Sequence, residues 1–120
     1  MFVLNTTVYE ALKKAADFIE RNPSNYNYFS MFVPPDLNHS GCLLGWTGYF
    51  LGMDHTYLTT TNTDVVRRLG HSCTLAFYDD VASCFGESHS FESFSDHKKS
   101  ADALRSVAEK YHKQAVREAA

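Results

Sequence analysis

The stretch from Gly41 to Gly52, GCLLGWTGYFLG, constrains the fold more than any other part of the sequence. It holds four glycines among large apolar residues. On a helix their spacing places all four within an arc of about 60°. The other faces are apolar, so such a helix belongs in the interior, where its glycines let another backbone approach closely. The stretch therefore predicts a buried central helix over 42–52. The residues assigned structural roles are Gly41, Cys42, Gly45, Trp46, Gly48 and Gly52.

Apolar residues at helical spacing predict a helix near each end of the chain. Thr7-Val-Tyr-Glu10 has the pattern of a capping box, and Asn22-Pro23 stops the helix that it opens. Ser95 or Asp96 caps the longest helix, which runs toward the C-terminus. The apolar positions are Val8, Leu12, Ala15 and Ile19 in the first helix and Ala101, Leu104, Ala108, Tyr111 and Ala115 in the last.

Two shorter helices are predicted between these. Asn62 or Thr63 caps one that Gly70 ends, and the other covers 74–85, with Gly86 as its stop. Segments 24–40 and 55–61 lack clear periodicity. The first can hold a short helical turn or one strand, and the second is a connector or an isolated strand. The sequence therefore predicts a mainly α fold, a single helical domain over 1–120 with four or five helices around the glycine-striped one.

Nothing in the sequence directs the chain to a membrane or out of the cell. The longest apolar run is far shorter than the roughly 20 residues that span a bilayer, and the first residues lack the basic flank of a signal peptide. Three cysteines, Cys42, Cys73 and Cys84, form an odd set without close pairing, which is typical of reduced thiols. We therefore expect a cytoplasmic protein that makes no membrane contact.

Histidines and cysteines offer two kinds of site chemistry. His39-x-x-Cys42 and His71-x-Cys73 supply zinc ligand types, but neither spacing matches a familiar zinc knuckle. Cys42 could also pair with a distant histidine as a nucleophile, yet it begins an apolar helix, where an inert core thiol is the simpler interpretation. We therefore predict no catalytic, metal-binding or cofactor-binding residue, and an enzyme dependent on metal or cysteine ranks third among the candidate functions.

A layout similar to a helix-turn-helix spans residues 63–85, with Gly70 at the turn. In that motif the second helix reads bases in the major groove. Here the second helix offers Asp79 and Asp80 and no Arg, Lys, Asn or Gln, so it is poorly suited to base edges and phosphates. This argues against nucleic acid as the partner. A small DNA-binding regulator, acting alone or as a homodimer, is the alternative function.

Aromatic side chains exceed what a small core readily buries. Segment 24–40 combines several of them with two prolines and contains no Lys or Arg, a composition that protein interfaces favour. The competing interpretation is that the aromatics pack loops 24–40 and 86–95 onto the core. The predicted partner-binding residues are Tyr26, Tyr28, Phe29, Phe32, Asp36, Phe91 and Phe94.

Several short sequence patterns, each different, are spread over most of the chain. They are Ala15-Ala-Asp-Phe-Ile-Glu20 with Asn22-Pro23, Gly41-Cys-Leu-Leu-Gly-Trp46 with Gly48, Val66 with Gly70, Phe77-Tyr78, and Ala103-Leu-Arg105 with Tyr111-His112. Together they resemble a group of small phage and prophage proteins of unknown function. The resemblance implies origin in a mobile element and assigns no reaction and no catalytic residues.

These observations lead to one predicted function. We expect a non-enzymatic accessory protein of a phage or mobile element that binds a host or phage protein in the host cytoplasm. Inhibition of a host defence system is a candidate role.

Overall fold

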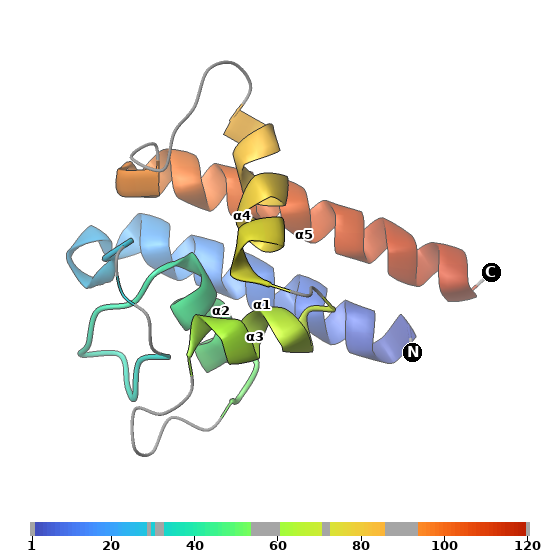
Figure 1. The fold of residues 1–120 in the computed structure, drawn as a ribbon, viewed down its shortest axis with the longest axis horizontal. Helices are drawn as coiled ribbons and strands as arrows, with labels where there is room; N and C mark the ends of the chain where they lie inside the picture. Colours follow the sequence, from blue (N-terminus) through green and yellow to red (C-terminus); the bar gives the residue numbers. More distant parts are fainter. Residues whose placement is uncertain are drawn as a thin grey trace.

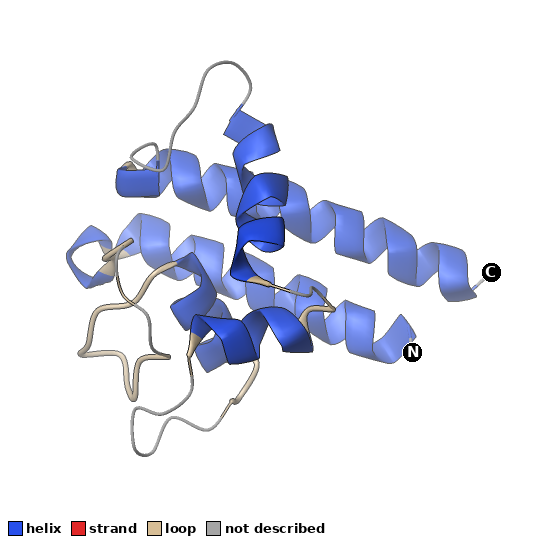
Figure 2. Ribbon diagram, viewed as in Figure 1, coloured by secondary structure: helices blue, strands red, loops and turns tan. Residues whose placement is uncertain are grey.

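Two long helices, α1 (Phe2–Arg21) and α5 (His97–Ala119), form one layer of the molecule, and three short helices cover one face of it (Figure 1). The computed structural model describes residues 2–28, 30, 33–53, 61–70, 73–85 and 94–119. Within these ranges the regular elements are helical (Figure 2), which confirms the predicted mainly α fold. Segment 24–40 contributes an isolated β-bridge between Tyr26 and Gly41. None of the described helices is long and apolar enough to cross a bilayer.

α1 and α5 run antiparallel, with both chain ends on the same side of the molecule (Figure 1). Leu12 and Ile19 of α1 and Leu104 of α5 are fully buried, as the apolar stripes predict. Arg105 of α5 links the two helices at the surface. Its guanidinium donates to Asp17 of α1 at 2.8 Å and pairs with Glu20 at 2.5 Å.

The start of α1 differs from the prediction. The helix begins at Phe2, so Thr7 lies inside it and does not cap it. The reason is visible in the sequence, because Leu4 precedes Val8 by one helical turn and the apolar repeat therefore extends back beyond the capping box. At the start of α5 the predicted cap is confirmed: the carboxylate of Asp96 accepts a hydrogen bond from the Lys99 amide at 3.0 Å. Ala115 lies beyond the residues whose side chains are described.

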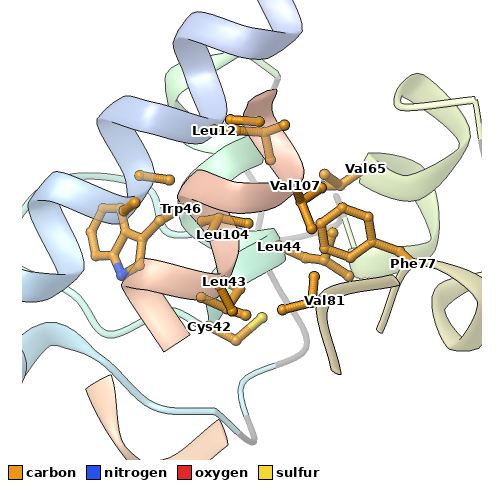
Figure 3. Close-up of a cluster of buried hydrophobic side chains, with 14 of the residues drawn as sticks. Leu12, Cys42, Leu43, Leu44, Trp46, Val65, Phe77, Val81, Leu104 and Val107 are labelled. Atoms are coloured by element: carbon orange, nitrogen blue, oxygen red, sulfur yellow. The ribbon is translucent and has the colours of Figure 1, made fainter. Parts of the chain in front are cut away.

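The predicted central helix is α2 (Leu43–Phe50), and its first six residues are buried. Cys42 caps it, since its sulfur accepts a hydrogen bond from the Gly45 amide at 3.4 Å. The helix is shorter than the predicted 42–52, because Cys42 is its N-cap, Leu51 is its C-cap and Gly52 follows with a φ of 76°. Gly52 thus ends the helix in a left-handed conformation that suits glycine and takes no part in a glycine stripe. The cluster in Figure 3 surrounds α2 with side chains from the other four helices.

α3 (Asn62–Arg68) and α4 (Thr74–Ala82) confirm the two shorter predicted helices. α4 continues into the 3₁₀ helix η2 (Ser83–Phe85), so the helical segment reaches the predicted end; Gly86 itself lies outside the described residues. The cap of α3 is Thr61, one residue earlier than predicted, because the Asp64 carboxylate accepts a hydrogen bond from the Thr61 amide at 2.9 Å. Most of segment 55–61 lies outside the described residues.

At Gly48, α2 lies close to two side chains from its neighbours. A β-carbon on Gly48 would lie 2.7 Å from Cγ2 of Val65 in α3 and 2.8 Å from Cγ2 of Val33 in the preceding loop. Both valines are fully buried and β-branched, so neither can turn aside without disturbing the core. Gly48 therefore permits close packing, as the sequence predicts, but the atoms packed against it belong to valine side chains and not to the backbone of another helix.

We expect Gly48→Ala to lower the free energy of unfolding by about 1–3 kcal/mol, because overpacking outweighs a gain of roughly 1 kcal/mol in helix propensity. Urea denaturation measures the change. In a Val65→Ala background the same substitution should cost less, because the contact with Val65 Cγ2 is removed and only that with Val33 remains. A Gly48→Ala variant as stable as the natural protein would contradict the close packing of α2.

Candidate partner-binding loop

Residues 33–41 connect a buried valine to the start of α2 and form the teal loop at the lower left of Figure 1. Val33 and Pro34 at one end and Gly41 at the other are buried, whereas 36–40 are exposed. A loop held at both ends by the core has few ways to move. We call residues 33–41 the 33–41 loop.

Asn25 fixes the middle of this loop. It is the last residue of the 3₁₀ helix η1 (Pro23–Asn25), and its side-chain amide donates to the carbonyls of Leu37 and His39, both at 3.0 Å. Its own carbonyl accepts from the Gly41 amide and from Nε1 of Trp46, again at 3.0 Å each. Asn25 therefore ties the 33–41 loop to the end of α1 and to the core of α2.

Asp36 shapes the exposed turn. Its Oδ1 accepts from the Asn38 amide at 2.8 Å and lies 2.8 Å from Nδ1 of His39. This is an Asx-turn, in which a short carboxylate replaces a backbone acceptor and stiffens the chain locally. As a result Leu37 is held on the outside with 48% of its surface exposed.

The predicted aromatic residues fall into different environments. Tyr26 is buried for the most part and its hydroxyl donates to the Phe94 carbonyl at 2.5 Å. Phe94 itself is 3% exposed, with the Tyr78 ring edge-on at 5.0 Å, so the prediction that it is a surface anchor is wrong. Packing explains the error, because Tyr26 and Phe94 fasten the loop region to the start of α5. Tyr28 packs half-buried against the core.

Of the remaining predicted residues, Asp36 is exposed and shapes the turn described above. Phe29, Phe32 and Phe91 lie outside the described residues.

Burial raises the pKa of three tyrosines, of which Tyr111 lies away from the 33–41 loop, against the end of α3. Tyr26 and Tyr78 both have a raised pKa, caused first by desolvation, and for Tyr78 the neighbouring Cys42 adds to the effect. Burial, with a smaller contribution from Asp80, raises the pKa of Tyr111 to about 12. The Tyr111 hydroxyl donates to the Leu69 carbonyl at 3.1 Å and so joins α5 to the end of α3. The neutral hydroxyls are therefore part of the folded structure.

We expect the protein to lose stability at alkaline pH. The contribution of a group with a raised pKa is complete below its unfolded value, about 10 for tyrosine, and is lost as the pH rises through the folded value, about 12 for Tyr111. Urea denaturation at a series of pH values above about 9 would measure the decline. Tyr111→Phe should make it shallower, and an unchanged slope would contradict the assignment.

His39 and Cys42, which were candidates for metal binding or nucleophilic catalysis, lie in different environments. His39 is on the exposed turn with Asp36, whereas Cys42 is fully buried and its thiol donates to Asn62 Oδ1 at 3.5 Å. Among the described residues no group of three or more metal-ligating side chains lies together. His71 is outside the described residues.

α3 and α4 are the two helices of the predicted layout similar to a helix-turn-helix, and Gly70 follows α3 in a left-handed conformation (φ 90°). Near its start α4 exposes Cys73 and Leu75, the latter with 68% of its surface accessible, and Asp79 follows one turn later. An apolar and acidic surface of this kind is a poor match for a DNA groove.

No protein-family model, curated protein or solved structure matches the chain. The candidate site therefore depends on the geometry of the 33–41 loop. The residues predicted from the sequence lie in the segment that contains this loop, but they do not include Leu37 and Asn25. Leu37 is the lone large apolar residue between Asp36 and Gly41, and that isolation was a usable signal. The role of Asn25 depends on contacts 12 and 14 residues away, which no local pattern reveals.

Proposed function

We propose that this protein works without catalysis, by binding another protein through the 33–41 loop. One observation supports this most: Leu37 is held outward on a turn whose backbone is already hydrogen-bonded to Asn25. An apolar side chain fixed before binding loses little conformational entropy when a partner covers it. Loops set rigidly on a scaffold are also where binding residues are commonly found.

The wider role follows from the sequence patterns quoted above. Their resemblance to phage and prophage proteins supports an accessory protein of a mobile element whose partner is a host or phage protein in the host cytoplasm. Inhibition of a host defence system would suit a small protein that acts by binding alone.

Leu37→Ser tests this proposal. Affinity capture from host lysate, quantified by mass spectrometry, should lose the specific partner with this variant, because truncating an interface anchor costs about 2 kcal/mol or more. Leu75→Ser is the matched control, since among the described residues it removes the other exposed large apolar side chain, on α4, and should leave capture intact. Thermal melting of both variants should stay close to that of the natural protein, because both side chains are exposed.

The opposite pattern would contradict the proposal. If Leu75→Ser abolished capture and Leu37→Ser did not, the partner would bind at α4. If folded Leu37→Ser captured the same proteins in the same amounts as the natural chain, the 33–41 loop would not be the interface.

A further inference from the structure

The exposed side of α1 carries a shallow open depression near its C-terminal end, with a volume of about 290 Å³. Two aromatic rings, Phe18 and Phe50, lie among its lining residues. Lys14, Asp17, Arg21 and Asn22 supply the polar part. This surface is separate from the 33–41 loop, and we call it the α1 depression.

The two aromatic rings of the α1 depression are held in place by packing against each other and against the core. The Phe18 ring lies 4.4 Å from the ring of Trp46 and 6.0 Å from that of Phe50, centroid to centroid. Trp46 is fully buried, and its Nε1 donates to the Asn25 carbonyl at 3.0 Å. Phe18 and Phe50 themselves remain partly exposed. The depression therefore offers a preformed apolar floor.

The charges at its edge are mainly positive. Lys14 and Arg21 are exposed and stand seven residues apart, two turns along the same face of α1. Neither forms an ion pair with another described residue. The acid of the lining, Asp17, accepts two hydrogen bonds from Arg105, at 3.2 and 2.8 Å, which offset its charge. Glu20 is likewise paired with Arg105, leaving Lys14 and Arg21 to face an approaching anion.

We propose that the α1 depression binds an acidic peptide segment of a partner protein, with one large apolar side chain seated over Phe18 and Phe50. Carboxylates flanking that side chain would meet Lys14 and Arg21. The Nδ2 of Asn22 already donates one N–H to the Phe18 carbonyl at 3.0 Å, and its second N–H would donate to the peptide backbone. Small-molecule sites usually have about 300–1,000 Å³ and enclose most of their ligand. This open depression is at the lower limit, which favours one side chain of a peptide over a free metabolite.

Trp46 is the only tryptophan of the chain and packs against Phe18, so its fluorescence can report binding. The probe is the synthetic peptide acetyl-Glu-Asp-Glu-Phe-Glu-Asp-Glu-amide, titrated at low ionic strength. We expect a saturable change in Trp46 emission and amide shifts between Lys14 and Asn22. Binding should weaken as salt shortens the Debye length from about 30 Å to about 8 Å. Peptides with Ser in place of Phe, or Lys in place of each acid, should bind at least about tenfold more weakly.

The double variant Lys14→Glu/Arg21→Glu should also lose about tenfold or more in affinity. The neutral pair Lys14→Gln/Arg21→Gln should show an intermediate loss and serves in its place if the reversal does not fold. Arg68→Glu/Lys110→Glu is the matched control, because it reverses two exposed cations on α3 and α5. Leu37→Ser should bind the peptide normally, so this proposal and the proposed function can fail independently.

Three results would overturn the proposal. One is the absence of any saturable response to the acidic peptide. Another is equal loss of affinity in the Arg68/Lys110 control, which would mean attraction by overall charge. The third is tighter binding of a small anion such as AMP, with shifts at the same amides, which would make the depression a small-molecule site.

Discussion

The hydrogen bonds of Asn25 join three parts of the molecule that are distant in sequence. Its side chain holds the carbonyls of Leu37 and His39, while its carbonyl accepts from Gly41 and from the Trp46 indole. The indole N–H of the buried Trp46 needs such a partner, because an unpaired buried polar group costs about 1–3 kcal/mol. Both surfaces proposed here depend on this residue: the 33–41 loop is set by its side chain, and the floor of the α1 depression lies on the tryptophan that its carbonyl orients.

The fold was predictable because its signals are local and repeated. Spacing of apolar residues identified α1, α2 and α5, and Gly70 and Asp96 marked helix ends by chemistry that acts within one turn. The predicted helix boundaries were wrong at the start of α1 and at the end of α2, where two sequence signals conflict. Thr7 has capping chemistry, but the apolar repeat runs through it, and Gly52 continues the glycine spacing although it terminates the helix.

The candidate site was less predictable, because exposure is a property of the whole fold. The aromatic composition of segment 24–40 indicated binding, yet Tyr26 bonds to the Phe94 carbonyl and both help to close the core. The α1 depression was missed for a related reason. Phe18 is one of many apolar residues in α1, and its sequence does not show that it is partly exposed. Its place at the surface, packed on Trp46, 28 residues later, is seen only in the fold.

From the hydrogen bonds of Asn25 we infer that the 33–41 loop is held in one conformation before any partner binds. Backbone ¹⁵N relaxation of the free protein tests this directly. We predict order parameters of about 0.85 for the amides of Leu37, His39 and Gly41, similar to those of α1. Values below about 0.6 at these amides, with α1 remaining rigid, would show that Asn25 does not fix the loop and would contradict the account.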